Sequence, residues 1–86
     1  GGVSDGLPQT DINADEANGM EMITALNKVG LTSSNGEARR LIRGGGARLN
    51  NEQINDETKT LSLDDFIDGK AKISAGKKRH ALLVLA

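Results

Sequence analysis

Residues 31–52, LTSSNGEARRLIRGGGARLNNE, decide the fold of this 86-residue chain. Ser34 and Glu37 have the spacing of a capping box, in which both side chains accept hydrogen bonds from backbone N–H groups at the start of a helix. Three consecutive glycines at 44–46 end the helical pattern. The stretch therefore predicts a helix over residues 35–43.

The predicted helix has an apolar face and a basic face. At about 100° per residue, Ala38, Leu41 and Ile42 fall on one side of it. Three arginines fall nearly opposite: Arg39, Arg40 and Arg43. Guanidinium groups offer flat pairs of donors that suit phosphate oxygens, so this face is a candidate site for a sugar-phosphate backbone. The spacing leaves an ordinary solvated helix face open as the alternative.

Patterns on either side of this helix predict its neighbours. Upstream, apolar residues at helical spacing predict another helix over residues 20–29, ended by Gly30. Downstream, the hydrophobic period shortens towards two, which is typical of strands. The runs 47–49 and 52–54 flank two asparagines, a residue type that tolerates the positive φ of a tight turn. We therefore expect a β-hairpin directly after the glycines.

The remaining residues add further short strands. Leu61 and Leu63 alternate with polar residues, and an Asp-Gly turn follows at 68–69. Two longer runs, 70–75 and 79–86, flank a basic turn. The order predicts an α+β fold, with two short helices packed on a small, mainly antiparallel sheet of four or five strands.

Composition and charge divide the chain into two parts. Residues 1–18 are rich in Gly, Asp, Asn, Ser and Thr, which predicts a flexible acidic linker before one domain over residues 19–86. Residues 1–22 have five acidic residues and no Lys or Arg, whereas residues 23–86 have eleven basic and seven acidic residues. The predicted domain is therefore basic, although the whole chain has a net charge of −1. Because the sequence begins Gly1-Gly2 without Met, we expect a piece of a longer protein.

A second basic cluster lies at the turn between the last two predicted strands: Lys77, Lys78 and Arg79. Alone, such a turn is usually solvated surface, but together with Arg48 and the helix arginines it favours nucleic-acid binding. Phe66 is the only aromatic residue, so the bases of an RNA would have no stacking platform. We expect binding through the backbone and shape of the nucleic acid.

Catalytic and metal chemistry have little support. The chain has no Cys, and its single histidine, His80, lacks a nucleophile and an orienting carboxylate at a useful spacing. We expect His80 to be structural or to face RNA. Asp64 and Asp65 are expected to serve as turn and capping residues. The glycines at 44–46 follow a helix, whereas phosphate-binding loops precede one. No catalytic residue, metal site, cofactor or membrane span is therefore expected.

Residues 31–52 resemble the ribosomal-protein-S-four-type RNA-binding domain, which has a fold of the kind predicted above. The matching residues are Ser34, Glu37, Ala38, Arg39, Leu41, Ile42, Gly46, Leu49 and Asn50. Asn51 departs from the family pattern, which usually has Gly there, and this bears on the turn type. The closing stretch 68–85, DGKAKISAGKKRHALLVL, and the Leu-Pro pair at 7–8 resemble the C-terminal domain of bacterial-type tyrosyl-tRNA synthetases.

This resemblance implies a domain that binds tyrosine tRNA at the long variable arm and anticodon side. It would position the tRNA for aminoacylation by a separate catalytic domain, which would use ATP and tyrosine. The implied RNA-binding residues are Arg39, Arg40, Arg43, Arg48, Lys77, Lys78 and Arg79. The chain alone is then not an enzyme and is expected to be monomeric, within a homodimeric ligase of the cytoplasm or the mitochondrial matrix.

Two alternatives stay open. One keeps the fold but places it in an rRNA-modifying enzyme or a ribosome-associated factor. The other is a protein-interaction module whose basic face binds an acidic protein. Preference for ribosomal RNA would mark the first, and binding that survives nuclease treatment would mark the second.

Overall fold

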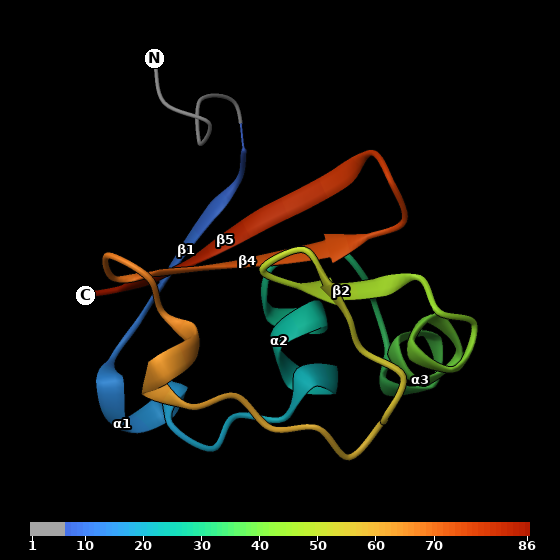
Figure 1. Cartoon of the computed structure of the whole chain (residues 1–86), viewed down its shortest axis with the longest axis horizontal. Helices are drawn as coiled ribbons and strands as arrows, with labels where there is room; N and C mark the ends of the chain where they lie inside the picture. Colours follow the sequence, from blue (N-terminus) through green and yellow to red (C-terminus); the bar gives the residue numbers. More distant parts are fainter. Residues whose placement is uncertain (1–6) are drawn as a thin grey trace.

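In the computed structural model, which describes residues 7–86, three helices lie on one face of a five-stranded sheet (Figure 1). In chain order the elements are β1 (Gln9–Ile12), α1 (Ala14–Ala17), α2 (Met22–Lys28), α3 (Asn35–Arg43), β2 (Ala47–Leu49), β3 (Glu52–Gln53), the 3-10 turn η1 (Leu63–Asp65), β4 (Lys70–Ala75) and β5 (Arg79–Leu85). The strand order is β1-β5-β4-β2-β3, with only the β1–β5 pair parallel. The predicted α+β class is confirmed.

Helix α3 has the predicted bounds because its ends are set by local contacts. The Ser34 hydroxyl accepts a hydrogen bond from the Glu37 N–H at 3.1 Å. The Glu37 carboxylate accepts one in turn at 3.0 Å, from the N–H of Ser33 rather than from that of Ser34. Ala38 and Ile42 are fully buried against the core, which leaves the arginines of the helix exposed.

The β2–β3 hairpin forms as predicted. Asn50 and Asn51 have φ values of 52° and 73°, the left-handed conformation that a type I′ turn requires at both central positions. The Asn50 amide donates to the Asp65 carbonyl at 2.7 Å and accepts from the Lys72 N–H at 2.9 Å. These two bonds hold the turn against η1 and β4, and the hairpin forms with Asn51 in place of Gly.

The flexible-linker prediction is wrong for the residues that form β1 and α1. Strand β1 pairs in parallel with β5, and Ile12 and Ala17 are 2% and 0% exposed. The acidic side chains around them point to solvent, so the composition of the stretch is polar although two of its residues reach the core. Composition averages over a stretch, whereas a single edge strand needs only one buried side chain and one partner strand. Residues 1–6 of the predicted linker lie outside the described residues.

The core lies between the sheet and the helices and is built from aliphatic side chains. The largest fully buried apolar side chains are Met22, Leu26, Ile42, Leu61, Ile73 and Leu83. The predicted strand around Leu61 and Leu63 is not formed. Leu61 is instead held beside the start of α2, where its N–H donates to Met20 O and its carbonyl accepts from the Gly19 N–H, both at 2.7 Å.

The residues after Leu61 form η1, with a capping box between Ser62 and Asp65. The predicted capping role is confirmed for Asp65, whose carboxylate accepts from the Ser62 N–H at 2.9 Å. None of the described helices is long and apolar enough to cross a membrane.

Candidate nucleic-acid interface

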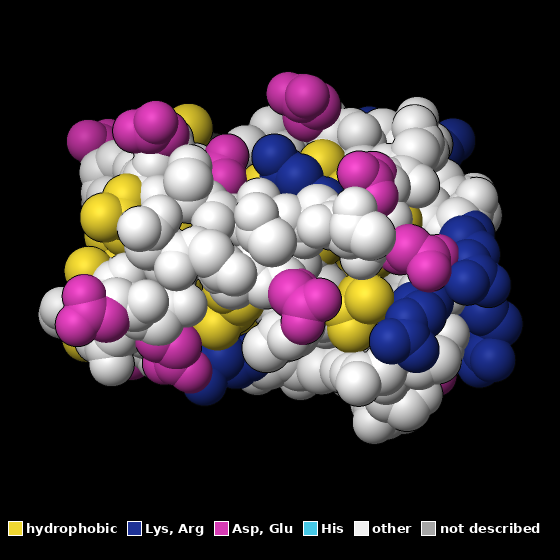
Figure 2. All heavy atoms as spheres, turned by 90° about the horizontal axis from the view of Figure 1, so that it is seen from below, with side chains coloured by type: hydrophobic (Ala, Val, Ile, Leu, Met, Phe, Trp, Pro, Cys, Tyr) yellow, Lys and Arg dark blue, Asp and Glu magenta, His cyan; other side chains and the backbone are white. Residues whose placement is uncertain are grey.

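The three α3 arginines lie together at one end of the molecule. Figure 2, which views the molecule from the helix side, shows Lys and Arg side chains gathered at the end where Figure 1 places α3. Arg39, Arg40 and Arg43 are all exposed. Within residues 7–86, Arg39 and Arg40 form no ion pair, because the Glu37 carboxylate is engaged at the helix cap. The guanidinium N–H groups of Arg39 and Arg40 are therefore exposed to solvent and available to a ligand.

Arg43 differs from its neighbours because it is paired with Glu57. Its Nε and Nη2 atoms donate to the two carboxylate oxygens at 2.5 and 3.2 Å. This hydrogen bonding raises the pKa of Arg43 and lowers the pKa of Glu57 from their ordinary values, and the charges of the pair act in the same directions. Glu57 is 14 residues away in an irregular segment, so no helical spacing could have revealed the pair.

Replacing Glu57 with glutamine is expected to make the stability less dependent on acid pH. Since the pKa of Glu57 is lowered by folding, the pair stabilises the protein above the ordinary carboxyl pKa and stops doing so as pH falls through the lower folded value. The urea midpoint of Glu57→Gln should therefore lie below that of the parent at about pH 7 and approach it at about pH 3. An equal difference at both pH values would show that the ion pair contributes nothing.

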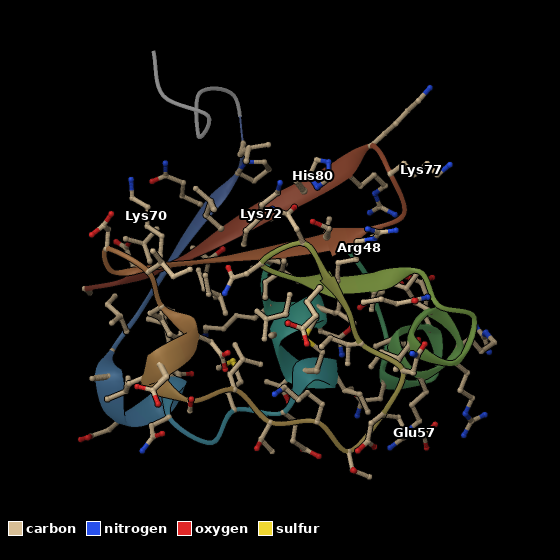
Figure 3. The ribbon with its side chains drawn as sticks, in the orientation of Figure 1. Arg48, Glu57, Lys70, Lys72, Lys77 and His80 are labelled. Atoms are coloured by element: carbon tan, nitrogen blue, oxygen red, sulfur yellow. The ribbon has the colours of Figure 1, made fainter. Side chains whose placement is uncertain are left out.

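Arg48 and the β4–β5 turn are brought to the same end of the molecule as α3. The N–H of Gly76 donates to the carbonyl of Gly46 at 2.7 Å, which ties the turn to the start of β2. Arg48 is exposed between the buried Ala47 and Leu49, so its side chain lies on the sheet face opposite the helices. Figure 3 shows Lys77 at the tip of the turn, beyond Arg48. The turn that carries Lys77 and Lys78 of the predicted second basic cluster thus lies beside the strand of Arg48, while the α3 arginines lie on the helix side.

Arg79 has a structural contact of its own. It is paired with Ala75, a core residue, and its Nη2 donates to the Leu31 carbonyl at 2.9 Å. The bond joins the start of β5 to the loop between α2 and α3. Arg79 therefore lies on the helix side of the sheet, away from the face of Arg48.

His80 holds the same turn from the outer face. Its Nε2 lies 3.1 Å from the Lys77 carbonyl, and its Nδ1 lies 2.7 Å from the hydroxyl of Ser74. Because a carbonyl oxygen only accepts, we assign the proton to Nε2, and Nδ1 then accepts from the serine. Ser74 is 0% exposed, and this bond satisfies its hydroxyl. Both ring nitrogens serve the fold, as expected for a structural histidine.

Sequence reasoning missed two cationic residues, Lys70 and Lys72, on the same outer face. The signal was present, because β4 reads KAKISA and alternates between polar and buried side chains. The Lys72 ammonium donates to the Asn51 side chain at 3.0 Å. Within residues 7–86, no group of three His, Asp or Glu side chains is placed to hold a metal ion.

Comparison of the sequence with known proteins places the chain in a family. The family model "Tyrosine--tRNA ligase SYY-like C-terminal domain" matches residues 2–83. Similar proteins include the tyrosine--tRNA ligase of Gluconobacter oxydans, 46% identical over 84 residues, and that of Rhizobium meliloti, 40% identical over 85 residues. Each alignment covers 96% of this chain and 20% of the relative.

The tyrosine--tRNA ligase of Methylocella silvestris is 43% identical over 86 residues, which is 99% of this chain. The chain thus spans about a fifth of the length of the curated relatives that it matches. With the family model matched over nearly every residue, the chain belongs to the family of tyrosine–tRNA ligase C-terminal domains.

Proposed function

We propose that this chain is the tRNA-binding domain of a tyrosine–tRNA ligase. The exposed arginine pair on α3, Arg39 and Arg40, forms no ion pair within residues 7–86, and this observation carries the proposal. In the proposed role the domain binds tyrosine tRNA at its long variable arm and anticodon side. It positions the tRNA for aminoacylation by the catalytic part of the longer ligase.

The chemistry of the surface supports backbone contacts rather than base reading. Arg39 and Arg40 can each give two parallel hydrogen bonds to a phosphate. Arg48, Lys77 and Lys78 add positive charge at the neighbouring edge. The single aromatic side chain, Phe66, is 9% exposed and cannot stack on a base. Binding should therefore weaken steeply as salt rises, because each neutralised phosphate releases counterions.

The domain supplies affinity and orientation in this proposal, and the chemistry is left to the catalytic part of the ligase. That part would bind ATP and tyrosine, and the present domain would need no cofactor. It would be monomeric by itself, with any dimer contacts made elsewhere in the ligase. The proposed place of action is the cytoplasm, where the tRNA is charged.

Titration of the isotope-labelled chain with tyrosine tRNA, followed by NMR, tests the proposal. Chemical-shift changes are expected in residues 37–48 and 76–80, and they should be larger than with a tRNA that has a short variable arm. Equal and weak changes with both RNAs would reduce the domain to a general RNA binder. No change at low salt would contradict RNA binding altogether.

A further inference from the structure

The sheet face opposite the helices carries a row of cations. Ala71, Ile73 and Ala75 of β4 are buried on the helix side, so the alternating Lys70, Lys72 and Ser74 lie on the other face. Arg48 is paired with Ser74 in the neighbouring strand and shares this face. Figure 3 shows Lys70, Lys72 and His80 along the outer side of the sheet, with Lys77 at its far end. We call Arg48, Lys70, Lys72 and Lys77 the sheet-face row.

The row is largely free of neutralising charge. Within residues 7–86, none of its four members forms an ion pair. Glu52 of β3 is paired with Leu49, which is buried on the helix side, so it belongs to the other face of the sheet. On the face of the row, the acidic residue nearest by strand register is Asp11 of β1, two strands from Lys70. Lys72 bonds to the neutral side chain of Asn51, which fixes its ammonium group but leaves its charge and two further donors available. Four like charges are therefore held on one face without acidic partners to stabilise them.

The row has the dimensions of a linear polyanion. Alternate residues of a strand are about 6.6 Å apart, so the lysines of β4 stand in line. The six residues of β4 extend the row over about 20 Å before the turn. A compact anion would need cations that converge on one point, whereas these are spread along a strand. The chain has no Tyr or Trp, Phe66 is buried, and both ring nitrogens of His80 are engaged within the fold, which again suits phosphates rather than bases.

We propose that the sheet-face row binds a second stretch of phosphodiester backbone in the RNA whose first stretch lies on α3. This inference rests on the proposed function and adds Lys70 and Lys72 to the binding residues. The α3 arginines lie on the helix side and the row lies on the opposite side. A bound RNA thus passes around the end of the domain where Arg48 and Lys77 lie, and it contacts the α3 arginines on one side and the sheet-face row on the other. Such two-sided contact selects a folded RNA with two backbone segments over a single short duplex.

The test compares two double variants of equal charge change in this 86-residue chain. Lys70→Ala with Lys72→Ala removes two charges from the row. Lys28→Ala with Lys59→Ala removes two from elsewhere, and Lys28 is already paired with Glu16 at 3.3 Å. Affinity for tyrosine tRNA is measured over a range of salt concentrations, and thermal unfolding checks that each variant folds. A third variant with arginine at positions 70 and 72 keeps the charge.

The row variant, which has alanine at positions 70 and 72, is expected to bind tyrosine tRNA on the order of tenfold more weakly. The plot of log affinity against log salt concentration should become less steep by about two, one for each lost phosphate contact. The control and the arginine variant should bind like the parent chain. Equal affinity of the row variant and the control would overturn the inference. The proposed function would still stand if replacement of the α3 arginines abolished tyrosine tRNA binding. It would be contradicted if neither that replacement nor the row variant changed the affinity for this tRNA.

A second probe separates RNA from an acidic protein partner. Polyglutamate is titrated into the same variants under the same conditions. A loss of polyglutamate binding in the row variant, with tRNA affinity unchanged, would assign the row to an acidic protein and overturn the inference. A loss of tRNA affinity at equal polyglutamate affinity would support it.

Discussion

Replacing Arg39, Arg40 and Arg43 together with alanine is expected to weaken tyrosine tRNA binding by about 2–4 kcal/mol, or about 30- to 1,000-fold. Arg39 and Arg40 should account for most of this loss, at about 1–2 kcal/mol each, because their donors are free. Arg43 should contribute least, since Glu57 already accepts two of its hydrogen bonds. Filter binding at fixed, moderate salt measures the affinities.

The fold should tolerate this variant, so lost binding would not reflect unfolding. All three positions are exposed on α3, and alanine has the highest helix propensity of any residue. Glu57→Gln is a test with the opposite expected sign, since it removes the negative charge that pairs with Arg43 and acts on Arg39. It should bind RNA more tightly than the parent chain. Unchanged affinity in the triple variant would place the RNA site elsewhere.

Leu61→Ala is expected to lower the free energy of unfolding by about 2–5 kcal/mol, the usual range for a fully buried leucine. Leu61 is 1% exposed and anchors the irregular segment between β3 and η1 to the start of α2. A domain of this size has about 4–13 kcal/mol of stability in total, so the variant should be close to unfolding. Urea denaturation followed by circular dichroism measures the change, because the chain has no Trp or Tyr for fluorescence.

Leu63→Ala is the matched control, two residues away and of the same type. Leu63 is 42% exposed in η1, so it buries less apolar surface and should cost about 1 kcal/mol or less. The sequence pattern treats both leucines alike, as alternate residues of one strand. Equal destabilisation by the two variants would contradict the burial that distinguishes them.

The local elements of this domain could be predicted from sequence because local interactions build them. Helix α3 begins at the Ser34 N-cap and ends at glycines, and both signals lie within a few residues of the element. The two asparagines of the β2–β3 turn carry positive φ by their own propensity. Strand β4 shows its two faces by alternation alone. The basic face of α3 and the α+β class followed from these patterns.

Contacts between residues distant in the chain were decided by the tertiary structure alone. Strand β1 exists because β5 accepts it as a parallel partner, and its polar composition hid it. Arg43 is neutralised by a glutamate from an irregular segment, and Arg79 is bound to the Leu31 carbonyl. The sheet-face row forms because antiparallel pairing sets Arg48 beside β4. The sequence by itself thus determined the elements and the sign of their charge. Only the packing of those elements decided which charges stay free and which face they share, because it brings together groups that no local period relates.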